Sequence, residues 1–491
     1  MHPRQHIKLH IEPGCSCLSS TKINRKNTHL SQIPICTNLR SEVCSRLLKT
    51  RDRKPHSYDN NSRTGPDHAS VVNDNSRRSG KKTGFIQRQR TVTGAGFAQT
   101  VVLGYLANPE ATREELHQTA AGAGMTLSTQ GLDKRFTPKA AYFLDSLLAE
   151  AVTQMVGVIP QAQGLLARFA GVYIADCSQV ALPEALAGMF RGNNGEQDAA
   201  VKVAVQIEMN SGQLGLWWHD GVVHDQRTGV SAHSLPPGTV RLNDLGFFNL
   251  ATFAEDERNQ VYYFSRYKVG TLVYTTDGMP LDVVKYLKQQ GEQGCDLAVQ
   301  LGADRLPCRL LALPVPPEQV GKRRKRLEET AKRKQQPVSA RALALVAWTI
   351  YVTNIPREQL SLREAAILGG TRWQIECLFK LWKSSGGLAD SRSQDPQRVL
   401  CEFYAKLLAV LVAHWLLVVS CWQRLDRSLH RATQVLRKQV LALLNAWTEL
   451  PLLTRALEQT AAIIRTTCGM SKRHTHPLTF QRWLEVETVD G

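Results

Sequence analysis

The sequence predicts an α/β core flanked by helical regions at both ends. Short apolar strands separated by turns fill residues 161–269, and two of them lead into an aspartate, Asp176 and Asp244. Helical apolar periodicity dominates residues 84–160 and 396–491. The chain has 491 residues, enough for several domains, and a formal charge of +18, which favours an anionic partner, nucleic acid first.

Residues 1–83 differ in composition from the rest of the chain. The first 90 residues contain 18 Lys and Arg against 6 Asp and Glu, and apolar positions show no period. We expect a disordered basic extension, which is either an arm for DNA or a mis-assigned start of the reading frame. We favour the second because the composition changes abruptly near residue 83. Cysteines at irregular spacing predict reduced thiols in a cytoplasmic protein.

Residues 84–160 predict a helical DNA-binding domain. Thr112 and Glu115 have the spacing of a capping box at the start of a helix. A turn with glycines follows, and Ser128 is a candidate N-cap for a second helix. This order is typical of a helix-turn-helix, although plain helical pairs share it. Lys134 and Arg135 would then lie late on the recognition helix.

Residues 161–269 form the first part of the predicted core. We expect the strand in "FAGVYIADCSQVALP" to end at Asp176, and a hairpin with a Ser-Gly turn to follow. The next strand ends at Asp244 and precedes a helix. Residues 270–355 mix short strands with a charged helix at 317–336 and close on a strand that carries Trp348. The apolar run at 407–422 is short for a membrane span and suits a buried helix, so no membrane partner is expected.

The segment "TRWQIECLFKLWKS", residues 371–384, predicts an amphipathic helix. Its apolar side chains fall on one face at i, i+3, i+4 and i+7: Ile375, Leu378, Phe379 and Trp382. A separate stripe carries one acid among three bases: Arg372, Glu376, Lys380 and Lys383. The stripe is either a solvated face with an ordinary ion pair or an active-site carboxylate in a groove that binds a polyanion.

Asp176, Asp244 and Glu376 together have the chemistry of a magnesium site. Three carboxylates that meet at strand ends and a helix can hold two divalent cations for in-line phosphoryl transfer. Each residue also has an ordinary alternative. Asp176 suits an Asx turn, Asp244 a helix cap, and Glu376 a surface ion pair.

Taken together, "YIADCSQVALP", "VRLNDLGFF" and "TRWQIECLFKLWKS" resemble the three catalytic motifs of bacterial DDE transposases of insertion-sequence family four, a family that includes hairpin-forming enzymes. The third motif of that family contains a tyrosine, two residues, an arginine, three residues, a glutamate, six residues and a lysine. Arg372, Glu376 and Lys383 match this spacing, whereas Gly369 stands at the tyrosine position. The resemblance covers about residues 84–490.

The resemblance implies an α/β RNase H-like catalytic core with a β-rich insertion domain, plus N-terminal and C-terminal helical regions. Its core would comprise residues 161–269 and 356–395, with the insertion at 270–355. Asp176, Asp244 and Glu376 would be the catalytic, metal-binding triad for two Mg²⁺ ions, which Mn²⁺ can replace. The DNA-binding residues it implies are Arg372, Lys383, Lys380, Trp373 and Trp348, the last as a pocket for a flipped base.

The implied function is cut-and-paste transposition. The protein would bind the terminal inverted repeats of an insertion sequence, cleave the DNA and join its ends to target DNA. Double-stranded DNA would be the partner, and residues 396–491 would pair two chains on two ends, in the bacterial cytoplasm at the nucleoid. Two alternatives stay open, an RNase H-like nuclease that joins no strands and an inactive DNA-binding remnant.

Overall fold

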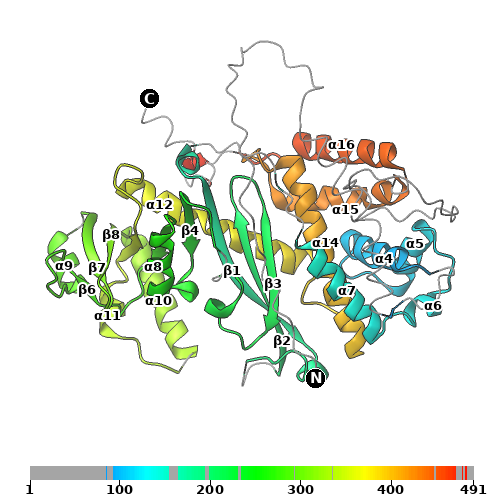
Figure 1. The fold of residues 1–491 in the computed structure, drawn as a ribbon, viewed down its shortest axis with the longest axis horizontal. Helices are drawn as coiled ribbons and strands as arrows, with labels where there is room; N and C mark the ends of the chain where they lie inside the picture. The colour runs from blue at the N-terminus through cyan, green and yellow to red at the C-terminus, as the bar shows by residue number, and fades with distance from the viewer. Residues whose placement is uncertain are drawn as a thin grey trace, which may run out of the picture.

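The computed structural model describes residues 84–85, 92–153, 157, 164–193, 198–230, 234–291, 293–333, 335–446, 449–471, 478 and 481–483. The predicted basic extension, residues 1–83, lies outside these described residues. Figure 1 shows a central sheet, with the N-terminal and C-terminal helices gathered on one side of β3.

Four helices open the described chain: α4 (Gly94–Ala107), α5 (Arg113–Gly122), α6 (Thr129–Asp133) and α7 (Pro138–Ala151). The predicted capping box is confirmed, because Thr112 caps the backbone of Glu115 and the Glu115 side chain returns to the backbone of Thr112. Ser128 caps α6 as predicted. The helix that it begins is much shorter than we expected, with five residues.

Nine strands form one mixed sheet: β1 (Gly171–Leu182), β2 (Ala199–Glu208), β3 (Leu214–Asp220), β4 (Thr239–Asn243), β5 (Tyr262–Arg266), β6 (Val273–Tyr274), β7 (Cys295–Leu301), β8 (Leu306–Pro314) and β9 (Trp348–Thr353). Their order is β3-β2-β1-β4-β5-β9-β8-β7-β6. β4 is parallel to both β1 and β5, and the other neighbours are antiparallel. The hairpin of β2 and β3 is confirmed. The strands of residues 270–355 extend the same sheet, because β9 pairs with β5.

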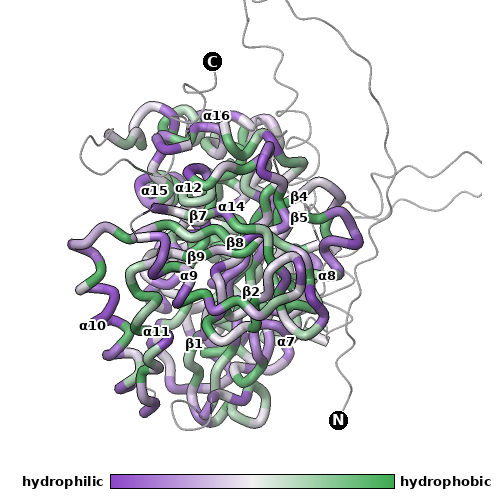
Figure 2. Tube along the Cα trace, turned by 90° about the vertical axis from the view of Figure 1, so that its left-hand side faces the viewer, coloured by the Kyte–Doolittle hydropathy of each residue, from purple (hydrophilic) through white to green (hydrophobic). Residues whose placement is uncertain are grey.

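Helices pack against both faces of this sheet. One face of β5, β7, β8 and β9 and the helices α8 (Leu250–Arg258) and α9 (Val283–Gln290) enclose a second apolar cluster, which includes Phe253, Tyr263 and Val352. The charged α10 (Pro317–Arg333) has no buried residue. It extends from the body of the protein in Figure 2. α11 (Ala340–Ala344) then leads into β9.

The main apolar cluster lies on the opposite face of the sheet. It is shared by α12 (Leu362–Thr371), α13 (Trp373–Lys380), the following π-helical turn Leu381–Ser385 and α14 (Pro396–Cys421). The predicted buried helix is confirmed, because α14 is buried over most of its length and packs against α4 and α7. It is also the one helix of the described residues long and apolar enough to cross a membrane, with 89% of its most apolar window inside the protein. α15 (Leu429–Ala446) and α16 (Leu450–Thr467) complete this side.

Candidate active site

Asp176 lies in the middle of β1, where one of the two partner strands ends. β1 pairs with β4 as far as Ala175 opposite Asn243, and pairs with β2 up to Leu182. The predicted strand end at Asp176 is therefore wrong, because the antiparallel β2 continues to bind the backbone of β1. Asp176 still follows the last parallel pair directly, at the edge where parallel strands open toward a ligand.

Asp244 follows the last residue of β4 and precedes a 3-10 turn at Leu245–Phe247. Its side chain makes no capping hydrogen bond. Among the described residues its carboxylate has no hydrogen-bond or ion-pair partner. The helix-cap alternative for Asp244 is thus wrong. Since Ala175 and Asn243 are paired, Asp176 and Asp244 stand side by side on neighbouring strands.

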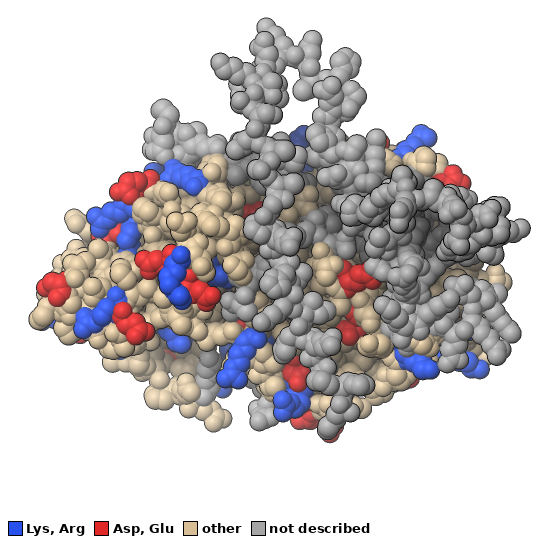
Figure 3. All heavy atoms as spheres, in the orientation of Figure 1, with Lys and Arg blue, Asp and Glu red and all other residues tan. Residues whose placement is uncertain are grey.

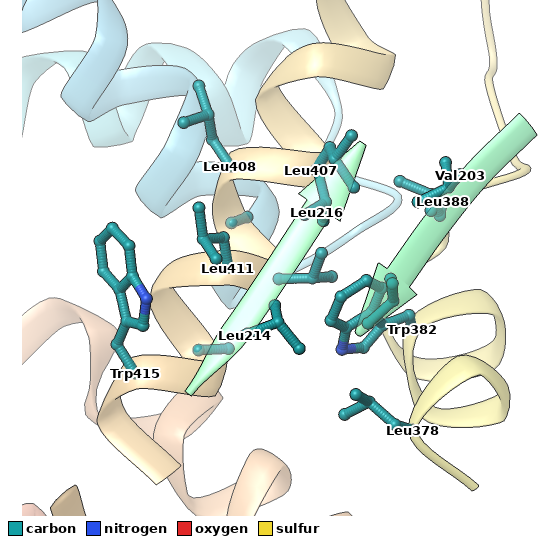
Figure 4. Close-up of a cluster of buried hydrophobic side chains, with 14 of the residues drawn as sticks. Val203, Leu214, Leu216, Leu378, Trp382, Leu388, Leu407, Leu408, Leu411 and Trp415 are labelled. Atoms are coloured by element: carbon teal, nitrogen blue, oxygen red, sulfur yellow. The ribbon is translucent and has the colours of Figure 1, made fainter. Parts of the chain in front are cut away.

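Glu376 comes from the first turn of α13, which the main apolar cluster fixes in place. The predicted inward face is confirmed, with Ile375, Leu378, Phe379 and Trp382 all buried. Figure 4 shows Leu378 and Trp382 directed into the cluster formed with β2, β3 and α14. Because α13 packs on β1, this anchoring brings Glu376 over the strand that carries Asp176.

Arg372 connects the acids electrostatically. Its guanidinium forms an ion pair with Glu376 one helical turn away, and both side chains are mostly covered, 21% and 26% exposed. This pair is therefore not part of a solvated face. Arg372 also acts on Asp176, where its charge lowers the pKa.

The carboxyl of Asp176 has a raised pKa of about 6. Burial is the main cause, and the negative charges of Asp244 and Glu376 raise it further. The hydrogen bond from the backbone N–H of Cys177, 2.8 Å from Oδ1, and the charge of Arg372 act in the opposite direction. Asp244 and Glu376, from two other elements, therefore act electrostatically on Asp176, whose ionised form is disfavoured.

The donor set fits a hard divalent cation. All three side chains offer carboxylate oxygens, the ligands that Mg²⁺ and Mn²⁺ accept, and a cation would relieve the repulsion that raises the pKa of Asp176. As placed, no three His, Cys, Asp or Glu side chains within the described ranges stand close enough to hold an ion. Glu376 is instead engaged by Arg372. The residues fit the group chemically, and ligation requires Glu376 to turn from Arg372.

The raised pKa of Asp176 should make the stability of the protein depend on pH. A carboxyl whose pKa is raised on folding, here from 3.8 to about 6, stabilises the fold at low pH and loses that contribution as the pH rises through 6. We predict that Asp176→Asn, which cannot ionise, gains stability over the wild type between pH 4 and 6, by up to about 3 kcal/mol. Urea denaturation in EDTA at pH 4 to 7 measures the difference. The control is Asp304→Asn, which removes an exposed acid. A stability difference between Asp176→Asn and the wild type that does not change with pH would contradict the raised pKa of Asp176.

The other basic residues of this helix lie on its exposed side. Lys380 places its ammonium 4.0 Å from the ring centre of Trp373, which is 48% exposed. Lys383, in the π-helical turn, is exposed as well. The structure therefore pairs Arg372 with Glu376 and leaves Lys380, Lys383 and Trp373 exposed, available to a ligand.

Trp348 is not brought to the carboxylates. It begins β9 and packs, partly buried, against the second apolar cluster, whereas Tyr351 of the same strand belongs to the main cluster. Trp348 therefore occupies the position of an ordinary core tryptophan. Its backbone carbonyl accepts a hydrogen bond from Arg323 at 3.4 Å.

Lys134 and Arg135 are exposed, but they do not lie on a long recognition helix. α6 ends at Asp133, so Lys134 is its C-cap and Arg135 lies beyond it. The expectation of a full second helix is wrong because the chain turns to bury Phe136, whose ring lies 5.7 Å from that of Phe97. A single turn presents few side chains to a major groove.

Two side chains that the sequence did not single out continue the row of acids across the sheet. Asn243 is opposite Ser265, so Arg266 follows next to Asp244, and Arg266 is itself opposite Tyr351. The order Asp176, Asp244, Arg266, Tyr351 thus runs over four neighbouring strands. No sequence signal marks it, because the register joins segments far apart in the chain.

Comparison with known proteins finds a family model and several relatives that match this chain. Residues 167–412 match the model of the transposase DDE domain family, a span that includes all three acids. The chain is 28% identical over 358 residues to the transposase of insertion sequence element IS231F from Bacillus thuringiensis subsp. israelensis, which covers 67% of this chain and 74% of that protein. It is 23% identical over 367 residues to the transposase of IS1151 from Clostridium perfringens, covering 69% and 77%.

The domain match spans half of the chain and implies an RNase H-like α/β core, which the mixed sheet provides. The predicted family number stays a prediction. The chain belongs to the bacterial DDE transposases, enzymes that act on DNA.

Proposed function

We propose that this transposase binds the terminal inverted repeats of an insertion sequence, cleaves the DNA there and joins the ends to target DNA. The observation that carries the proposal is the convergence of Asp176 from β1, Asp244 from the end of β4 and Glu376 from α13 in one electrostatic field. Asp176 and Asp244 form no ion pair among the residues described, which leaves their oxygens available to a metal.

Asp176, Asp244 and Glu376 are the residues that would hold two divalent ions, Mg²⁺ or, in its place, Mn²⁺. When bound, such ions make a hydroxyl a better nucleophile and stabilise the departing 3′ oxygen. The buried α13 face and the β1–β4 pairing fix the elements that carry the three carboxylates, and Glu376 would turn from Arg372 to complete the site.

The basic side chains would orient the DNA. Arg372 leaves Glu376 for a phosphate oxygen next to the cut, where a guanidinium can bind two oxygens at once. Lys380 and Lys383, exposed on the same helix, would hold neighbouring phosphates, and Trp373 offers an exposed ring to an unstacked base. On the face visible in Figure 3, Lys and Arg alternate with Asp and Glu over the described residues, so the net charge alone does not define a track for DNA.

Pairing of two chains would use the outer helices of the C-terminal region. α14 is buried within the chain and has no surface to offer, whereas Leu452 and Ile463 on α16 are 48% and 37% exposed. Their separation of eleven residues places both on one face of the helix. We infer a homodimer on paired ends through this face, in the cytoplasm where the host DNA lies.

A strand-joining assay tests this function. Purified protein, Mg²⁺ and a labelled duplex of the element's end, read from the DNA that flanks the reading frame, are mixed with a plasmid target. We expect labelled ends joined to the plasmid, and sedimentation of the complexes should show two chains with two ends. Cuts without joined product would favour the RNase H-like nuclease, and absence of both would favour the inactive remnant.

A further inference from the structure

Tyr351 is the fourth residue of the row that Asp176, Asp244 and Arg266 form across the sheet. Its ring lies against Gly369 of α12. A Cβ atom added at Gly369 would overlap the Tyr351 hydroxyl oxygen and would lie 2.5 Å from Cζ and 2.8 Å from Cε1. The phenol of Tyr351 therefore fills the space that any side chain at residue 369 would take. Gly369 lies three residues before Arg372, on the same helical side.

Two arginines face this phenol without acidic partners. Arg266, directly opposite Tyr351 in the sheet, is exposed, and Arg323 reaches in from α10 and is half-buried. Arg323 donates a hydrogen bond to the backbone carbonyl of Trp348, three residues before Tyr351, at 3.4 Å. Burial lowers the pKa of Arg323, and the charge of Arg266 lowers it further. Neither forms an ion pair with a carboxylate in the part of the chain that the structure describes.

The hydroxyl of Tyr351 is also uncommitted. It makes no hydrogen bond to any described residue. Its oxygen keeps some contact with solvent, unlike the buried side-chain atoms that lack both a partner and solvent contact. Burial of the ring raises the pKa of Tyr351, whereas the charges of Arg266, Arg323 and Arg372 act in the opposite direction. The phenol thus lies in the electrostatic field of three guanidinium groups, and its oxygen is not fully sealed from solvent.

We propose that Tyr351, Arg266 and Arg323 form a binding site for one phosphate group of the DNA strand that enters the active site. Two guanidinium groups without acidic partners, and a phenol hydroxyl without a hydrogen-bond partner among the described residues, are the complement of a phosphate. The proposal deepens the proposed function and rests on it. Tyr351 supplies from β9 the phenol that the third motif leaves out at Gly369.

The site lies one and two strands from Asp244, so the phosphate that it holds is close to the one that is cut. Tyr351 and Arg266 act as positioning residues, since the register puts them beside the carboxylates rather than among them. Arg323 adds a contact from α10, which joins this helix to the DNA path.

Binding without cleavage tests the site. A duplex of the element's end is bound in EDTA, and then bound again with single phosphates near the cut replaced by uncharged methylphosphonate. At one position the replacement should weaken wild-type binding about tenfold, the loss expected for a hydrogen bond to a charged group. The variants Tyr351→Phe and Arg266→Gln should each bind the unmodified duplex about tenfold more weakly than the wild type does. Methylphosphonate at that same position should weaken their binding little further.

Two variants control for general effects. Tyr263→Phe removes a buried hydroxyl on the opposite face of the sheet, and Arg324→Gln removes an exposed charge next to Arg323 on α10. Both should retain wild-type affinity and the wild-type response to methylphosphonate. Wild-type binding by Tyr351→Phe and Arg266→Gln, with the full loss at every replaced phosphate, would overturn the site.

Moving the phenol from β9 to α12 separates position from folding. Tyr351→Ala should weaken binding, and Tyr351→Ala combined with Gly369→Tyr should restore at least part of it, because the new ring enters the vacated space from the helix. No recovery in a double variant that folds with the wild-type circular dichroism would count against the exchange. If the wild type itself neither binds nor cleaves the end duplex, the proposed function fails; if it does both and the variants match it, only the phosphate site fails.

Discussion

Asp176→Asn, Asp244→Asn and Glu376→Gln should each abolish metal-dependent cleavage of the element's ends, by at least about 10³-fold, while end binding persists. Each substitution keeps the size of the side chain and removes one anionic oxygen ligand. Because the three acids act on one another electrostatically, loss of any one should lower the affinity of the site for divalent ions. The site would then stabilise less of the negative charge that develops on the phosphate during cleavage. Gel assays of cleavage with Mg²⁺ and of binding in EDTA measure the two effects.

The control for these variants is Asp304→Asn, an exposed acid in the turn between β7 and β8, which should cleave like the wild type. Persistent cleavage by any one of the three variants would remove that residue from the triad. Loss of binding together with cleavage would instead point to a structural role.

Asp256→Ala should lower the free energy of unfolding by about 3–5 kcal/mol, the cost of removing one member of a buried ion pair. Asp256 on α8 accepts two hydrogen bonds from Arg241 on β4, at 2.8 Å and 2.9 Å, and both side chains are almost fully covered. Burial raises the pKa of Asp256, and the hydrogen bonds and charge of Arg241 oppose that rise. The pair holds α8 against β4, the strand that Asp244 follows, so we also expect weaker cleavage.

Urea denaturation measures this loss, with Glu255→Ala as a control in which the neighbouring exposed acid is removed. The control should change stability by less than about 0.5 kcal/mol. An equally small change for Asp256→Ala would show that the buried pair does not hold α8 to the sheet.

Local patterns predicted the parts of the site that short-range physics decides. The 3.6-residue period gave the buried face of α13, and with it the side from which Glu376 projects. The spacing of Thr112 and Glu115 gave the start of α5, and the apolar run at 407–422 gave a buried helix. Each of these depends on residues within one or two turns of each other.

Long-range pairing decided what the sequence did not reveal. Asp176 lies within β1 rather than at its end because β2, which follows β1 in the sequence, continues to pair with β1 beyond Asp176. The strands of residues 270–355 join the core sheet through β9 and β5, which are about eighty residues apart. The contact between Tyr351 and Gly369 joins a strand to a helix, and no period or motif in either segment announces it.

We expect Asp176, Asp244 and Glu376 to form one metal site. Electron paramagnetic resonance of free Mn²⁺, titrated into protein bound to the end duplex, counts the ions held by the wild type and by Asp176→Asn, Asp244→Asn and Glu376→Gln. We predict two bound Mn²⁺ per wild-type chain and the loss of at least one in every variant. Equal Mn²⁺ binding by all four proteins would contradict the shared site.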